Sequence, residues 1–158
     1  MHASRMMTGA AMLAVLGACA GLPRGMEPLS VTLVDVRPGQ VGLLEQEYAI
    51  KIRVQNPNGV EVPLQGVAFD VELNGMTFAK AVSPQSEVVP AFGDAVLDVK
   101  AISTLGDVLE QVGAMRDGQP GRISYRLLGK LAPAHGPYLP FDSAGEIDFR
   151  ALAGGARE

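Results

Sequence analysis

Apolar and polar residues alternate with a period of two over much of this chain. Between residues 48 and 54, every second side chain is apolar, and the residues between them are mostly charged or small. Residues 67–73 repeat the pattern. Because successive side chains of a strand point to opposite faces, each stretch predicts a strand with one buried and one solvated face.

The charged residues of these two stretches can be explained by pairing within a sheet. If the stretches are neighbouring strands, Lys51 and Arg53 lie opposite Asp70 and Glu72. Each such pair contributes a few tenths of a kcal/mol. The charges then need no catalytic explanation.

Turn residues divide the rest of the chain into further strands. Asn74-Gly75, between two apolar alternations, predicts a two-residue hairpin, because both residues tolerate positive φ. Additional strands are predicted at residues 31–36, 95–102, 122–131 and 145–150. About seven antiparallel strands are enough for two packed sheets, so the predicted fold is an all-β sandwich.

A single helix is predicted among the strands. Thr104 followed by Asp107 resembles a capping box, and Asp117-Gly118 is typical of a helix end. Five apolar residues lie on one face of this helix: Leu105, Val108, Leu109, Val112 and Met115. Such a stripe usually packs on the core, and the alternative is a groove for an apolar ligand or a partner.

The N-terminal residues resemble a bacterial lipoprotein signal that ends in Leu16-Gly17-Ala18-Cys19. Arg5 supplies the positive start, and an apolar run and small residues follow. We expect a signal peptide at residues 1–18, a lipidated Cys19, and a short tether over residues 19–28. The alternative is that Cys19 is a small buried residue or a lone reactive thiol.

Composition and charge narrow the function classes. Removing residues 1–18 leaves 140 residues, which we divide into the tether at residues 19–28, one domain at residues 29–150 and a tail at residues 151–158. Hydrophobic residues make up 47% of the chain, which excludes a disordered protein. Loss of Arg5 changes the net charge from −4 to −5, which disfavours nucleic acid as a partner.

Candidate catalytic residues are few. His135 is the one histidine after residue 18, in a predicted loop, and no second cysteine accompanies Cys19, so we expect no metal site and no cofactor. Glu45 and Glu47 share a strand face, but without tryptophan there is no sugar platform beside them. These residues predict a protein that is not an enzyme.

One motif points to a family. Asn56-Pro57-Asn58 ends the best-patterned strand, where proline stops the sheet ladder and asparagine bonds the local backbone. It precedes the 67–73 strand, the Asn74-Gly75 hairpin and a Leu-Gly-Lys-Leu strand at residues 128–131. Together these resemble the type 2 late embryogenesis abundant proteins, or water stress and hypersensitive response (WHy) domain, over residues 29–149.

The resemblance implies an immunoglobulin- or fibronectin-III-like antiparallel β-sandwich with one α-helix, no catalytic residues, and a role in desiccation and other stress. Three hypotheses follow for a domain anchored through Cys19. It protects the cell envelope during water loss, it binds a lipid or another apolar ligand, or it docks on an envelope complex. Because Ala20 is not aspartate, we expect the periplasmic face of an outer membrane.

Overall fold

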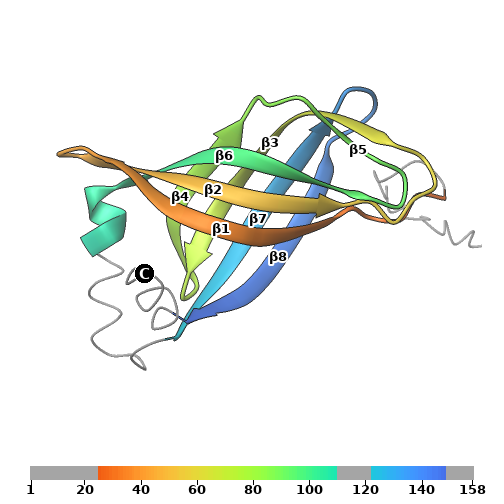
Figure 1. The fold of residues 1–158 in the computed structure, drawn as a ribbon. Coiled ribbons are helices and arrows are strands. Elements are labelled where there is room, and N and C mark those ends of the chain that lie inside the picture. The colour runs from red at the N-terminus through yellow and green to blue at the C-terminus, as the bar shows by residue number, and fades with distance from the viewer. Residues whose placement is uncertain (1–24, 110–121, 149–158) are drawn as a thin grey trace, which may run out of the picture.

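The computed structural model describes residues 25–109 and 122–148, and eight strands form one antiparallel sheet in this part of the chain (Figure 1). Their order is β1-β2-β6-β4-β3-β7-β8, with β5 paired to β3. The strands are β1 (Ser30–Val41), β2 (Glu45–Gln55), β3 (Val62–Leu73), β4 (Met76–Ser83), β5 (Glu87–Val89), β6 (Asp94–Thr104), β7 (Arg122–Pro133) and β8 (Leu139–Asp148).

The sheet curls into a half-barrel. The layer of β1, β2 and β6 crosses the layer of β4, β3, β7 and β8 at an angle (Figure 1). Only three residue pairs, centred on Ala81 and Ala101, join β4 to β6 and so connect the layers. The all-β antiparallel prediction is confirmed. The immunoglobulin-like sandwich is not confirmed, because all the described strands belong to one sheet.

The core lies between the two layers. Burial follows the predicted period of two, and in β6 every second residue from Leu97 to Ser103 is buried. The least exposed side chains come from both layers: Ile52, Val54, Leu97, Val89, Leu127 and Leu131. These side chains fill the space between the layers and stabilise the curl.

The two ends of the half-barrel differ. At one end the start of β1 lies beside Pro140–Ala144 of β8, and we call this the closed end. At the other end, which contains the Asn74-Gly75 hairpin, the edge strands β1 and β8 diverge, and we call it the open end (Figure 1).

Local predictions agree with the structure. Asn74 and Gly75 have φ values of 52° and 79°, which confirms the hairpin turn. The capping box is confirmed because the Thr104 N–H donates to Asp107 Oδ2 at 2.8 Å and the Asp107 N–H donates to Thr104 Oγ1 at 3.3 Å. A helix follows at residues 105–109, and the predicted helix residues beyond 109 lie outside the described residues.

The predicted partners of Lys51 and Arg53 are wrong. Strand β2 pairs with β1 and β6, and does not pair with β3. Lys51 Nζ therefore lies 2.7 Å from Asp98 Oδ1, and Arg53 Nε lies 3.4 Å from Asp94 Oδ2. The expected type of interaction is present, but its acidic partners come from β6.

Strand limits differ from the prediction at the edges of the sheet. Strand β5 was not predicted, and β8 begins at Leu139, before the predicted 145–150 segment. Pro140 is compatible with β8 because this strand is an edge strand of the described sheet, where proline is tolerated. Pro38 is tolerated in the edge strand β1 for the same reason, next to an irregularity between Pro38 and Val41.

Candidate functional site: an apolar cavity at the open end

The Asn56-Pro57-Asn58 motif is placed at the closed end, where it binds backbone from distant segments. Asn56 is 2% exposed. Its Nδ2 donates to the carbonyl oxygens of Val60 at 2.8 Å and Pro90 at 3.0 Å, and its Oδ1 accepts from the Asn58 N–H at 3.0 Å. Its buried amide is therefore satisfied on both sides.

Asn58 continues this network toward the N-terminus. Its Oδ1 accepts from the Glu27 N–H at 2.7 Å, and its Nδ2 donates to the Glu27 carbonyl at 2.9 Å. The Asn58 carbonyl accepts from the Phe92 N–H at 3.0 Å. The motif thus joins the segment before β1, the end of β2 and the β5–β6 loop, which is a structural role.

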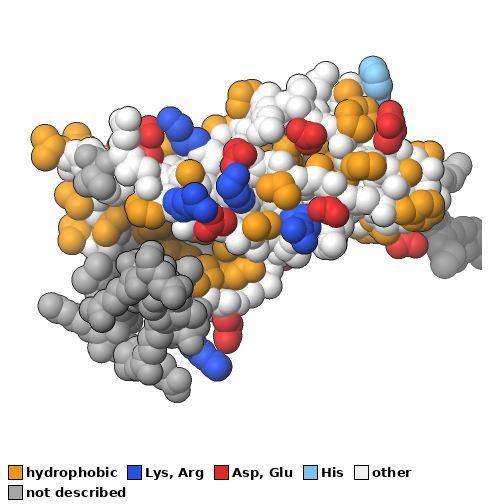
Figure 2. Space-filling view, viewed as in Figure 1, with side chains coloured by type: hydrophobic (Ala, Val, Ile, Leu, Met, Phe, Trp, Pro, Cys, Tyr) orange, Lys and Arg blue, Asp and Glu red, His pale blue; other side chains and the backbone are white. Residues whose placement is uncertain are grey.

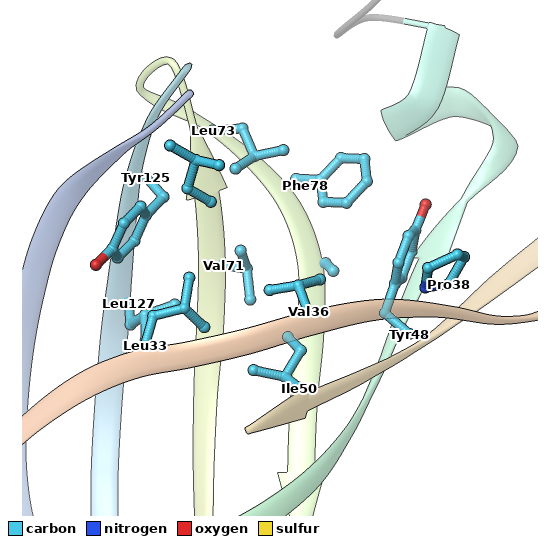
Figure 3. A pocket seen from close by; sticks show the side chains of 12 residues that line it. Leu33, Val36, Pro38, Tyr48, Ile50, Val71, Leu73, Phe78, Tyr125 and Leu127 are labelled. Atoms are coloured by element: carbon cyan, nitrogen blue, oxygen red, sulfur yellow. The ribbon is translucent and has the colours of Figure 1, made fainter. Parts of the chain in front are cut away.

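The open end contains a cavity of about 300 Å³ between the two layers (Figure 3). Twelve residues of the described part, from β1, β2, β3, β4, β7 and β8, line it, and these twelve are apolar or tyrosine. One residue from each of these strands illustrates the lining: Leu33, Ile50, Val71, Ala79, Leu127 and Ile147. Its size and lining are those of a small apolar-ligand pocket.

Aromatic rings form much of the cavity wall. The Tyr48 and Phe78 ring centroids lie 5.3 Å apart, so the two strands that flank β6, β2 and β4, contact each other at the cavity wall (Figure 3). The buried Ser103 hydroxyl lies 3.5 Å from the Tyr48 hydroxyl. Tyr125 lies over Gly145, where a Cβ would come within 2.6 Å of the tyrosine oxygen. Glycine at 145 therefore makes room for one wall of the cavity.

The cavity is open where β1 and β8 diverge. Val36 lines it and is still 40% exposed. Figure 2 shows hydrophobic side chains gathered below the β1–β2 layer, at the side where the half-barrel is open. Among the described residues, no charged side chain lines the cavity.

The predicted groove on the helix stays a prediction. Leu105 and Leu109 are exposed, neither lines the cavity, and Val112 and Met115 lie outside the described residues. The Leu105 N–H donates to the Leu44 carbonyl at 3.0 Å. This bond places the start of the helix beside the β1–β2 turn, so exposed leucines gather there.

Six ion pairs lie at the surface of the described part of the chain. Arg126 Nε donates to Asp142 Oδ1 at 2.8 Å, which lowers the pKa of the Asp142 carboxyl. The hydrogen bonds from Thr104 lower the pKa of Asp107. His135 lies in the β7–β8 loop and is exposed. Within residues 25–109 and 122–148, no group of three or more potential ligands could hold a metal ion.

The described helix is neither long nor apolar enough to cross a membrane. Cys19 lies outside the described residues, so the predicted lipidation remains a prediction. The geometry in the described part therefore supports binding of an apolar group at the open end, and no arrangement of residues there suggests a reaction.

Sequence reasoning missed the cavity-lining residues, including Val36 and Tyr125. Their alternation with polar neighbours identifies them as inward-facing, but it cannot distinguish a filled core from a hollow one. The weak available signal is Gly145, a glycine inside a strand, which often marks the close approach of another group.

The comparisons with known proteins agree with this fold. The family model of the late embryogenesis abundant proteins, LEA_2, matches residues 51–145. This chain therefore belongs to the LEA_2 family. No match was found among curated proteins.

One solved structure has the same kind of fold, and two others match less closely. The solution structure of an Arabidopsis thaliana protein is 19% identical, with a TM-score of 0.59, and the match covers 80% of this chain and 87% of that one. A crystal structure from Archaeoglobus fulgidus is 17% identical, with a TM-score of 0.48, over 78% and 97% of the two chains. A solution structure described as a late embryogenesis abundant protein is 23% identical, with a TM-score of 0.47, over 76% and 70%.

Proposed function

We propose that this protein is a membrane-anchored, non-enzymatic LEA type 2 lipoprotein that protects the cell envelope during water loss. The observation that carries the proposal is membership of the LEA_2 family, which suggests a stress-related, non-enzymatic role.

The anchor in this proposal is the lipid on Cys19, with the domain held by the tether at its closed end. Support comes from the signal-like sequence before Cys19 and from the position of Glu27, which Asn58 binds at that end. Several acyl chains on one cysteine give a durable membrane attachment. The open end of the half-barrel would then face away from the attachment point.

The protective role is tested by drying and rehydrating a labile enzyme with the chain from Ala20 to Glu158. This fragment keeps all of the described residues. The comparison is an inert acidic protein of equal size. We expect clearly greater survival of enzyme activity, and equal survival would contradict intrinsic protection.

The anchor is tested separately, by expressing the whole chain in a bacterium that is fed a labelled fatty acid. We expect label on the wild-type chain in the membrane fraction, and neither label nor membrane association for Cys19→Ser. Label on the serine variant would contradict lipidation at Cys19.

A second candidate function is binding of a lipid or another apolar ligand, and the cavity at the open end specifically favours it. Native mass spectrometry of the Ala20–Glu158 chain purified from cells tests this function. A bound apolar molecule released under mild activation is the expected result. Repeated observation of the empty chain alone would argue against it.

A further inference from the structure

We propose that the cavity at the open end binds a single unbranched hydrocarbon chain of about ten carbons, and that it selects by chain length and not by head group. This inference rests on the second candidate function, binding of an apolar ligand, and adds the class of ligand and the rule of selection.

Volume sets the chain length. A methylene group takes up about as much room as a water molecule in the liquid, about 30 Å³. A cavity of about 300 Å³ therefore holds about ten such groups. Two parallel chains of that length would need about twice the space, so a single-chain molecule fits and a two-chain lipid leaves one chain outside.

Among the described residues, the lining holds no charged side chain that could pair with a charged head group. The described lining residues are apolar except for two tyrosines, Tyr48 and Tyr125. The Tyr48 hydroxyl already has Ser103 beside it, at 3.5 Å. Burying a charged group among these side chains would cost several kcal/mol, so the head group must remain outside the opening.

On each edge strand of the described part, an ion pair lies next to lining residues. On β1, Arg37 Nε lies 2.7 Å from Asp35 Oδ2. On the β7–β8 side, Arg122 Nη1 lies 3.7 Å from Glu146 Oε2. Each edge thus carries a neutral pair, which neither attracts nor repels a charged head strongly. Affinity must then come from the hydrocarbon.

Selection by chain length predicts that, along a series of ligands, the dependence of Kd on chain length changes at one point, which we call the break. Each methylene that leaves water contributes about 0.8 kcal/mol, which is about fourfold in Kd. We expect Kd to fall about fourfold per added methylene until the cavity is full at about ten carbons, and to stay level for longer chains.

The experiment measures displacement of a fluorescent naphthylamine probe from the Ala20–Glu158 chain. Competitors are saturated carboxylates and maltosides of about six to about sixteen carbons, each used below its micelle-forming concentration. The expected result is a break near ten carbons at the same position in both series. A continued fall to the longest chains, or a break that shifts with the head group, would overturn the length rule while leaving apolar binding intact.

Absence of both probe and competitor binding would overturn the apolar-ligand function together with this inference. The protective role is judged by the drying assay alone, so the failures remain distinguishable.

Substitutions in the cavity and on its outside test where the hydrocarbon chain binds. Ala79→Phe puts a ring into the cavity, and we expect it to weaken binding of the best competitor at least tenfold. Val82→Phe is the matched control, because Val82 is exposed on the same strand. Val36→Trp, at the half-exposed opening, gives a second blocking variant that does not depend on the core tolerating a larger residue. Unchanged binding in Val36→Trp, or equal losses in Val82→Phe and Ala79→Phe, would overturn the location.

Discussion

The closed and open ends of the half-barrel are stabilised by different kinds of interaction. At the closed end, buried amides of Asn56 and Asn58 bind backbone from three segments, and their polar atoms are satisfied. At the open end the layers diverge, and apolar side chains surround a cavity. Strong directional bonds hold one end together, and the other end is left with unfilled space.

This difference implies a division of roles. A hydrogen-bonded end keeps the crossing of the two layers constant, so the open end need not be filled to maintain the fold. We expect substitutions at the closed end to lower stability, and substitutions at the open end to change binding with little loss of stability.

The largest expected effect comes from Asn56→Ala. It leaves the carbonyls of Val60 and Pro90 and the N–H of Asn58 without their partner in a buried place. We expect a loss of about 3 kcal/mol in the free energy of unfolding, measured by urea denaturation. Gln55→Ala, at the exposed neighbouring position, is the control and should change stability by less than about 0.5 kcal/mol.

A similar small loss in both variants would show that the asparagine network does not hold the closed end. The contrast between the two ends would then have to be explained by apolar packing alone.

The second prediction compares two alanines of β4 that are equally buried, at 3% exposure. Ala79 lines the cavity, whereas Ala81 does not and pairs with Ala101 where the layers join. Ala81→Val overpacks this junction and should cost about 1 to 3 kcal/mol. Ala79→Val extends into free space and should be neutral or stabilise by up to about 1 kcal/mol.

The measurement is urea denaturation of both variants, compared where the free energy of unfolding has the same dependence on urea concentration in each. Equal losses at the two positions would mean that the cavity is not available space for an added methyl group.

Features that depend on near neighbours in sequence could be predicted. The Asn74-Gly75 turn and the Thr104–Asp107 capping box involve residues within a few positions of each other, so the residues alone specify the geometry. The alternation of β2 likewise predicted which of its side chains would be buried. Each of these follows from local backbone preference.

Features that depend on which distant strands pair could not be predicted from the sequence. Lys51 has an acidic partner in either arrangement, and only the pairing of β2 with β6 selects Asp98. The cavity depends even more on contacts between distant segments, because six strands contribute to it. Ala79 alternates like any core residue, and nothing in its neighbours shows that the space before it is empty.

The third prediction concerns the capping box near the open end. Hydrogen bonds from Thr104 lower the pKa of Asp107 in the folded protein. Its contribution to stability is therefore fully present above the unfolded-state pKa and is lost as the pH falls through the folded-state pKa. We expect Asp107→Asn to lower stability by less than about 1 kcal/mol at neutral pH, since the group is exposed.

The measurement is the difference in urea midpoint between wild type and Asp107→Asn from neutral to acidic pH. The difference should close at the acidic end, where wild-type Asp107 is also protonated. A difference that stays constant with pH would show that the carboxylate charge has no role in the cap.

The smallest effect is expected for Asp142→Asn on β8. The Arg126 guanidinium lowers the pKa of Asp142 through a hydrogen bond at 2.8 Å, but both side chains are about half exposed, so water and salt screen the pair. The urea midpoint at physiological salt should not move beyond experimental error. At low salt a slight loss should appear at neutral pH and vanish on acidification through the folded-state pKa. A large loss would mean that this ion pair holds β8 to β7, and that stability at this edge depends on charge as well as on the core.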